Sequence, residues 1–362
     1  MSTPSPPPSQ RLEIPPGLPR PGELLAGKYT VERLLGMGGM GVVLAARHVD
    51  LDERVAIKML LPHVQPQGEP VARFIREARA AIKIRNEHVV RVLDVGRLES
   101  GAPYIVMEYL EGSDLGQLVD RGGPLAVEAA IDYVTQACEA IAAAHAIGII
   151  HRDLKPANLF LARAGDGRPT VKVLDFGISK ISESSPQSTP GLTNTATIMG
   201  TPSFMSPEQL RSTRDVDARA DIWSMGAIVH ALLTGQPPYE GESNADVSAK
   251  IIRDAPTPLR QLRADVPEAL EAIVLRCLDK EPSRRFGDIA ELAQALGGVS
   301  TRDSVRAMAA RVVRVAAGVA PTLMSTPDVR PGVAPQAPSD PGATRTSSAW
   351  GETRREEKKA RS

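Results

Sequence analysis

From about Tyr29 to Leu296 the chain alternates short apolar runs with polar turns, a pattern that both ends of the chain lack. Residues 41–48 (GVVLAARH) and 54–60 (RVAIKML) are rich in β-branched and alternating apolar positions, which predicts two strands. The polar segment VDLDER between them predicts a turn. Residues 104–110 (YIVMEYL) predict a further strand.

A helix is predicted at 70–85 (PVARFIREARAAIKIR), where apolar positions recur at helical spacing. Phe74, Ala78, Ala81 and Ile82 fall on one face of this helix. That placement leaves Glu77 near the inward edge of the helix, facing the predicted strands.

Lys58 ends the strand motif VAIK and needs an anionic partner if it is to stay charged and aimed inward. Glu77 is the favoured partner, and Glu69, which precedes the predicted helix, is the alternative. Taken alone, Lys58 is equally consistent with a surface lysine whose stem lies along apolar side chains.

The two ends of the chain have a different composition. Residues 1–22 are rich in Pro and Ser and predict an unstructured arm, with PSPPP as an alternative polyproline ligand. An amphipathic helix is expected within 297–318, either docked on the preceding domain or a partner, or simply a last helix. Residues 319–362 predict a disordered tail.

Charge and cysteine content narrow the classes of function. The 43 basic and 43 acidic residues cancel, which argues against nucleic acid or an anionic membrane as a partner. Cys138 and Cys277 lie far apart in apolar surroundings and predict two buried thiols, not a disulfide or a zinc site. With no signal-peptide pattern and no run of 18 apolar residues, we expect a soluble, cytoplasmic protein without a membrane span.

Gly36, Gly38 and Gly41 have the spacing G-x-G-x-x-G, which two unrelated phosphate-binding structures share. A dinucleotide-binding fold would begin a helix after Gly41, with its N-terminus facing the pyrophosphate. The strand-like run after Gly41 instead predicts a hairpin tip, where backbone N–H groups can approach phosphate oxygens. Asp52 and Glu53 then lie in a turn and not at the end of a strand that would bind a ribose.

The segment 149–162 (IIHRDLKPANLFLA) carries the main candidates for catalysis. A turn and a short strand (VKVL) follow it and lead to Asp175, so a β-hairpin would place Asp175 beside Asn158. Both side chains offer the oxygen ligands that Mg²⁺ prefers. Asp153, five residues before Asn158, is placed to accept a proton from an attacking hydroxyl.

At these residues the chain resembles the eukaryotic-type (Hanks-type) bacterial serine/threonine protein kinases over about 29–296. The matching motifs occur in one order and are the glycines with Val43, VAIK with Lys58, HRDLKPAN from 151, DFG from 175, SPE from 206, DIWSMG from 221, and Arg285 in PSRRF. The resemblance implies an α+β, two-lobed protein-kinase fold. A small β-rich lobe with one helix would span about 29–110, and a larger, mainly helical lobe about 111–296.

The resemblance also implies roles for the site residues, with ATP and Mg²⁺ as cofactors and Mn²⁺ as an alternative metal. Lys58 would hold the α- and β-phosphates while paired with Glu77. Asp175 and Asn158 would be the metal ligands. Asp153 would orient and deprotonate the substrate hydroxyl, and Lys155 would neutralise charge on the transferred phosphoryl group.

Other residues would support the catalytic groups or bind the nucleotide. His151, Phe176 and Asp221 would support the catalytic loop, and Glu208 and Arg285 would form a buried ion pair. The hinge lies in PYIVMEYLEGSDL, and Asp114 there is either a ribose ligand or a surface acid at a helix start. The nucleotide-binding set is Leu35, Gly36, Met37, Gly38, Gly39, Met40, Gly41, Val42, Val43, Ala56, Lys58, Met107, Glu108, Leu110 and Asp114.

The resemblance implies protein Ser and Thr side chains as acceptors, because Lys155 in DLKPAN and Thr201 before PSFMSPE match the Ser/Thr branch of the family. Arg152 would await a phosphate on the Ser- and Thr-rich segment 182–201. The phosphorylation candidates are Thr193 and Thr195, with Thr197 as runner-up, and two chains would meet during autophosphorylation. The alternative for this segment is a solvated loop without a regulatory mark.

Two other functions fit parts of the pattern. A pseudokinase scaffold would lack an equivalent of Lys58, Asp153 or Asp175, and none is missing here. A small-molecule phosphotransferase of related fold would lack the long segment between DFG and PE, which this chain has.

Overall fold

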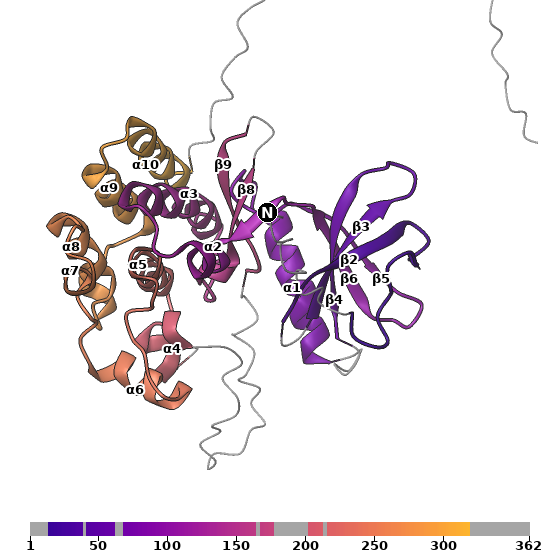
Figure 1. Cartoon of the computed structure of the whole chain (residues 1–362), viewed down its shortest axis with the longest axis horizontal. Helices are drawn as coiled ribbons and strands as arrows, with labels where there is room; N and C mark the ends of the chain where they lie inside the picture. The colour runs from indigo at the N-terminus through magenta and orange to yellow at the C-terminus, as the bar shows by residue number, and fades with distance from the viewer. Residues whose placement is uncertain are drawn as a thin grey trace, which may run out of the picture. The chain divides into compact units, whose positions relative to one another are not determined.

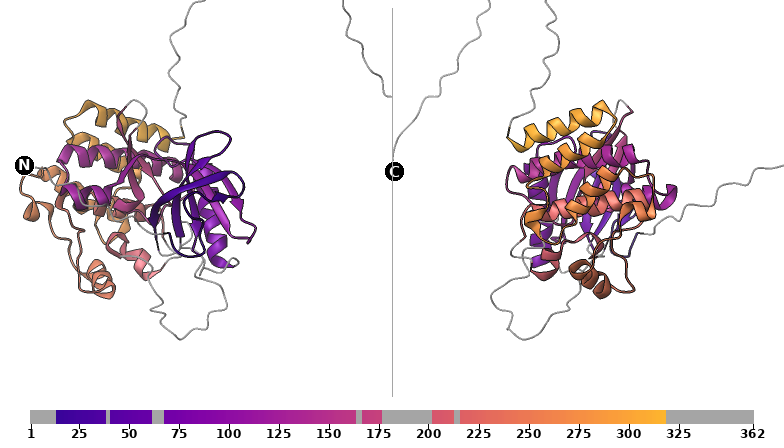
Figure 2. Two further views of the ribbon diagram at one scale, coloured as in Figure 1. Left: turned by 45° about the vertical axis from the view of Figure 1, so that its right-hand side comes forward. Right: turned by 90° about the vertical axis from the view of Figure 1, so that its left-hand side faces the viewer.

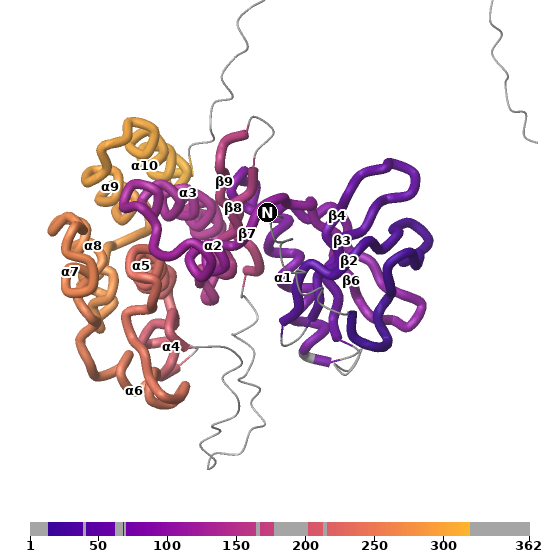
Figure 3. Tube along the Cα trace, in the orientation of Figure 1, coloured from indigo at the N-terminus to yellow at the C-terminus, as the bar shows by residue number. Residues whose placement is uncertain are grey.

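The computed structural model describes residues 14–38, 41–61, 68–163, 167–176, 202–212 and 216–318. The two lobes expected from the resemblance are present: strands dominate up to β6, and helices dominate after it (Figure 1). The tube in Figure 3 follows the chain through the first sheet and α1 into the helical part.

The small lobe is a six-stranded antiparallel sheet with the strand order β1-β2-β3-β4-β6-β5. Its strands are β1 (Leu24–Leu25), β2 (Tyr29–Met37), β3 (Gly41–His48), β4 (Arg54–Leu60), β5 (Val92–Arg97) and β6 (Pro103–Glu108). The helix α1 (Glu69–Lys83) joins β4 to β5 and packs on the sheet. Asp52 and Glu53 lie in the turn between β3 and β4, as predicted.

The apolar face of α1 differs from the predicted one at its end. Phe74 and Ala78 are buried against the sheet, whereas Ile82 is 54% exposed. Ile82 lies on the same helical face one turn later. It is not part of the apolar cluster of described residues to which Phe74 and Ala78 belong. The helix also begins at Glu69, so this residue opens the helix and does not precede it.

Residues packed on the small lobe begin earlier in the chain than the sequence suggested. Leu18 is buried in the core of the small-lobe sheet, and Ile14 packs against the same cluster. The prediction of an unstructured arm is therefore wrong for residues 14–22, and residues 1–13 lie outside the described part. Composition alone does not reveal two apolar side chains among many prolines, yet the burial of these side chains stabilises the position of residues 14–22 on the sheet.

The large lobe is built around two helices, α3 (Val127–His145) and α5 (Arg219–Thr234), whose side chains form most of its core. The other helices are α2 (Leu115–Gly122), α4 (Pro207–Arg211), α6 (Asn244–Arg253), α7 (Leu259–Leu262), α8 (Glu268–Cys277), α9 (Ile289–Val299) and α10 (Asp303–Ala316). A second antiparallel sheet has the order β7-β8-β9, with β7 (Gly112–Asp114), β8 (Leu159–Arg163) and β9 (Pro169–Val173). None of the helices in the described ranges is long and apolar enough to cross a bilayer.

The helix α10 lies within the segment 297–318, where a helix was expected, and it belongs to the large-lobe core. Val305, Ala309 and Val312 are buried, and α10 contacts α9 and α3 (Figure 2). Gly297 permits this packing, because a Cβ there would lie 2.9 Å from the Ala309 Cβ. Cys138 and Cys277 are free, buried thiols, as predicted.

Candidate active site

The glycine motif forms the predicted hairpin. Gly36 pairs with Val43 across β2 and β3, and the Gly38 N–H donates to Gly41 O at 2.8 Å. Gly41 has no room for a side chain, since a Cβ would lie 2.5 Å from the carbonyl oxygen of Met59. A strand follows Gly41, so the dinucleotide-binding alternative is wrong. Gly39 and Met40 lie outside the described residues.

Strand register decides which of the predicted nucleotide-binding side chains share a face with Lys58. Val43 lies opposite Lys58, and Met107 lies opposite Ala56, two residues before Lys58. These four side chains therefore point to one face of the sheet. Val42 points to the other face and is fully buried in the small-lobe core, so its predicted contact with the nucleotide is limited to its backbone.

Two further members of the predicted set lie at the hairpin. Leu35 sits at a register shift between Leu34 and Gly36, where the β2–β3 pairing is irregular. Met37 ends β2 and is 55% exposed. Both lie next to the tip, where a backbone can approach a bound phosphate.

Lys58 meets two carboxylates. Its Nζ lies 2.7 Å from Asp175 Oδ1 and 3.4 Å from Glu77 Oε2. Burial alone would lower the pKa of Lys58, but the two carboxylates outweigh burial and raise it. Lys58 is thus a positive charge held at the junction of β4, α1 and the end of β9.

The catalytic loop holds Asp153, Lys155 and Asn158 together. Lys155 Nζ lies 3.1 Å from Asp153 Oδ2. Asn158 Nδ2 donates to the Asp153 carbonyl at 2.7 Å and to Asp153 Oδ2 at 3.2 Å. Because the amide nitrogen of Asn158 is committed to Asp153, its amide oxygen remains to bind another group.

The β8–β9 hairpin brings Asp175 to this loop, as predicted. The Leu174 N–H donates to the Asn158 carbonyl at 2.9 Å, directly before Asp175. His151 Nε2 lies 3.0 Å from the Leu174 carbonyl, and its ring packs on Phe176 with centroids 4.7 Å apart. Burial lowers the pKa of His151, so it is a neutral packing and hydrogen-bonding residue.

Asp221 holds the backbone of the catalytic loop. It is fully buried, and its carboxylate accepts from the N–H groups of His151 and Arg152, each at 2.9 Å. Burial opposes its charge, but the bond from His145 Nε2 at 2.8 Å and the other donors lower the pKa of Asp221. Arg152 has φ 64° and Asp175 φ 45°, an uncommon backbone for residues other than glycine.

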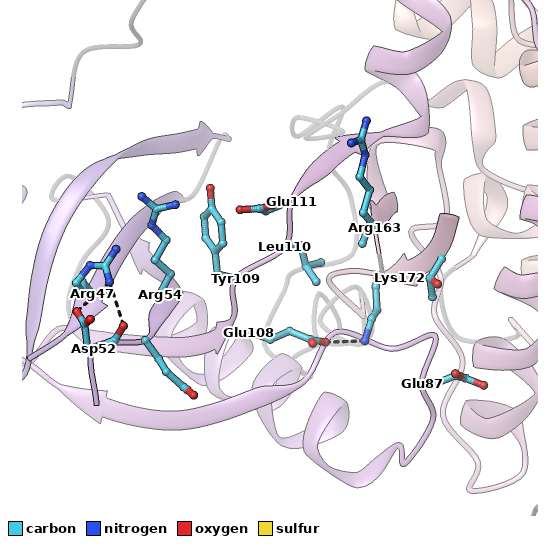
Figure 4. A pocket seen from close by; sticks show the side chains of 13 residues that line it. Arg47, Asp52, Arg54, Glu87, Glu108, Tyr109, Leu110, Glu111, Arg163 and Lys172 are labelled. Atoms are coloured by element: carbon cyan, nitrogen blue, oxygen red, sulfur yellow. Dashed lines mark hydrogen bonds and ion pairs between the residues drawn. The ribbon is translucent and has the colours of Figure 1, made fainter. Parts of the chain in front are cut away.

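The hinge follows β6. The Glu108 N–H donates to the Arg91 carbonyl at 3.0 Å, and the Glu108 side chain pairs with Lys172 at 2.9 Å. This side chain lines a charged groove of about 720 Å³ together with Tyr109 and Leu110 (Figure 4). Because the Glu108 N–H is bonded to Arg91, an adenine edge would use the other backbone groups from Glu108 to Leu110.

Asp114 is the N-cap of α2, since its Oδ1 accepts from the Gln117 N–H at 2.9 Å. Asp114 thus lies at a helix start, which was one of the two alternatives for this residue. Its role as a ribose ligand stays a prediction. Thr193, Thr195 and Thr197 lie outside the described residues.

The ion pair of Glu208 and Arg285 is bidentate, with N–O distances of 2.7 and 2.8 Å. Burial would raise the pKa of Glu208, but the bonds from Arg285 lower it.

Sequence reasoning missed one support of the catalytic loop. Gln209 Nε2 donates to the Arg152 carbonyl at 2.8 Å. Gln209 is also the third helical residue of a capping box that Ser206 begins at α4. The spacing S-x-x-Q is a recognisable signal of such a box and could have identified Gln209.

The comparisons with known proteins agree with this geometry. The protein kinase domain family matches residues 29–296. The chain is 41% identical to Serine/threonine-protein kinase pkn3 and 43% identical to Serine/threonine-protein kinase Pkn1, both of Myxococcus xanthus, over 73% and 75% of its length. These matches span 48% and 38% of the two relatives, so the chain spans about half of their length or less.

A solved structure of a kinase domain is similar to this chain. The crystal structure of the Mycobacterium tuberculosis PknI kinase domain matches with a TM-score of 0.59 and 30% identity, covering 78% of this chain and 99% of that one. The fold, the order of the motifs and the family match coincide over the same part of the chain, and the chain belongs to the protein kinase family.

Proposed function

We propose that the chain transfers the γ-phosphoryl group of ATP to Ser and Thr hydroxyls of proteins. The observation that carries the proposal is that Lys58, Asp175 and Glu77 meet within hydrogen-bonding distance. The catalytic loop with Asp153 adjoins them through the bond of Leu174 to Asn158. The names of the two Myxococcus xanthus relatives support Ser and Thr as acceptors.

A divalent cation fits the donors at this site. Asp175 offers a carboxylate, and its side chain is 45% exposed. Since the amide nitrogen of Asn158 is bonded to Asp153, the amide oxygen of Asn158 is available as a second ligand. Oxygen donors of this kind suit Mg²⁺ and also Mn²⁺. A bound cation would neutralise charge on the β- and γ-phosphates. Lys58, held beside Asp175 and Glu77, would bind the α- and β-phosphates.

The remaining groups position the acceptor. Asp153 would accept the proton of the Ser or Thr hydroxyl as the oxygen attacks phosphorus. Lys155, at 3.1 Å from that carboxylate, would balance the charge of the transferred phosphoryl group. The nucleotide would lie against the face of the sheet that carries Val43, Ala56 and Met107.

We also propose that a phosphate on Thr193 or Thr195 activates the chain, with Thr197 as the runner-up. The Nε and Nη1 atoms of Arg152 are buried without a hydrogen-bond partner among the described residues. Burial lowers the pKa of Arg152, so an anion beside it would be strongly favoured. The modification would occur between two copies of the chain, in the cytoplasm, where ATP is supplied.

The experiment incubates the purified chain with [γ-³²P]ATP, Mg²⁺ and a generic basic protein, followed by phosphoamino acid analysis. The proposal predicts label on Ser and Thr, and loss of that label in Asp153→Asn. A folded chain that transfers no label, or that labels Tyr, would contradict it. For the loop, Thr193→Ala with Thr195→Ala should lower activity severalfold, and loop labelling of the parent should rise with chain concentration.

A further inference from the structure

Arg311, on α10, links three elements that are distant in sequence. Its Nη2 lies 2.8 Å from Glu139 Oε1 and 2.5 Å from Glu87 Oε1. Glu139 belongs to α3, and Glu87 belongs to the loop of residues 84–91 between α1 and β5, called here the α1–β5 loop. Arg311 itself lies beyond residue 296, where the family match ends.

The charge of Arg311 compensates a carboxylate that water cannot reach. Glu139 is 1% exposed, and Asn86 Nδ2 donates to it at 3.1 Å. Within the described residues, the Oε2 atom of Glu139 has no hydrogen-bond partner. A buried carboxylate is costly without a cation or full hydrogen bonding. The bond from Arg311 lowers the pKa of Glu87, and both carboxylates raise the pKa of Arg311 against the effect of burial.

The α1–β5 loop is attached to the large lobe and to β9. Val89 is buried in the large-lobe core. The Val90 N–H donates to the Val173 carbonyl at 3.1 Å, and the Val173 N–H donates to the His88 carbonyl at 2.7 Å. His88 Nδ1 also lies 2.9 Å from the carbonyl of Val171. Backbone and side-chain hydrogen bonds therefore join the loop to β9 along its length.

This loop stands between two groups of the site. The helix α1, which carries Glu77, ends at Lys83, one residue before the loop. The strand β9 ends at Val173, two residues before Asp175. Both Glu77 and Asp175 meet Lys58, so the loop adjoins the elements that carry two of the three members of that cluster.

We propose that Arg311 is a positioning residue for phosphoryl transfer: it holds the α1–β5 loop against α3, and so keeps Glu77 and Asp175 on Lys58. The inference rests on the proposed function, because it assigns Arg311 a part in that reaction. The packing of α10 on the large lobe does not depend mainly on Arg311. Val305, Ala309 and Val312 supply it, while the Arg311 side chain is 37% exposed.

The test compares Arg311→Ala with Arg314→Ala, which removes the same charge from an exposed position of the same helix. Two properties are measured at a temperature where circular dichroism shows both variants folded. The first is kcat/KM for ATP, and the second is the hydrogen exchange of amides in residues 84–91 and 169–173. We expect Arg311→Ala to lose about tenfold in kcat/KM and to exchange faster in both segments. Arg314→Ala should match the parent.

Arg311→Lys separates positioning from a general effect on the fold. An ammonium restores the charge but not the planar fork, so this variant should fall between the parent and Arg311→Ala in both measurements. Full activity in a folded Arg311→Ala, a loss without faster exchange in the two segments, or an equal loss in Arg314→Ala would overturn the inference. An inactive parent chain would overturn the proposed function instead, while the exchange comparison would still show whether Arg311 holds the loop.

Discussion

Replacing Asp221 by Asn tests how the catalytic loop is held. The Asp221 carboxylate accepts from His145 Nε2 at 2.8 Å and from the N–H groups of His151 and Arg152 at 2.9 Å. Asn has one oxygen and one NH₂ group, so it can accept on only one side. On the other side its NH₂ group would face a backbone N–H, and two donors would meet in a buried space.

The magnitude follows from these contacts. Losing a hydrogen bond to a charged group costs about 1.5–3 kcal/mol, and a buried donor without an acceptor costs about 1–3 kcal/mol. Burying a neutral amide in place of a carboxylate returns part of this cost. We expect a net loss of about 3 kcal/mol in the free energy of unfolding.

The same change should slow catalysis. The left-handed backbone of Arg152, with φ 64°, costs about 1–2 kcal/mol in residues other than glycine, and the bonds to Asp221 hold it there. Without them the loop can relax, and Asp153 moves with it. A displacement of about 1 Å in a reacting group is enough for a loss of about 10²-fold in kcat.

Urea unfolding and steady-state kinetics measure the two effects, with Asp217→Asn as a control that removes a nearby exposed carboxylate. The stability from Asp221 is present above its unfolded pKa of 3.8 and is lost as pH falls through its lower folded pKa, so the deficit of the variant should shrink in acid. Stability and kcat equal to those of the parent would refute this account of the loop.

Three further predictions concern buried groups. Glu208→Gln leaves the Arg285 guanidinium without its carboxylate and should lower the free energy of unfolding by about 3 kcal/mol. Urea unfolding measures this loss, and an unfolding midpoint equal to that of the parent would contradict it. Burial lowers the pKa of Lys280 to about 8, so above that pH Lys280 holds its proton more often in the unfolded chain than in the folded chain. The free energy of unfolding should therefore rise from about pH 8 to about pH 10 in the parent and not in Lys280→Met. Unfolding curves of both proteins, measured at each pH, test this difference. Burial raises the pKa of the Cys138 thiol, and that of Cys277 to about 12, so neither should react with a thiol reagent until the chain unfolds.

The sequence predicted most of the site because its residues are close in sequence or joined by a hairpin. Asp153 and Asn158 share one loop, and the β8–β9 hairpin brings Asp175 to them. The contact of Lys58 with Glu77 followed from the helical face of α1 and from the resemblance.

The parts that sequence reasoning missed depend on tertiary contacts. Helical spacing placed Ile82 on the inward face but could not show where the covering side chains end. Leu18 was assigned to a proline-rich arm, because composition does not show that one leucine is buried in a core. The link from Arg311 to Glu87 spans 224 residues, and no local pattern encodes a contact at such a distance.

The central claim is that Asp153 acts on a hydroxyl beside a nucleotide held by Lys58 and Asp175. The most direct measurement compares the parent with Asp153→Asn in kcat for peptide phosphorylation and in Kd for Mg²⁺-ATP. The account predicts a loss of about 10²–10⁴-fold in kcat with Kd almost unchanged, as expected when a general base is removed from an intact site. An Asp153→Asn chain that phosphorylates the peptide at the rate of the parent would contradict it.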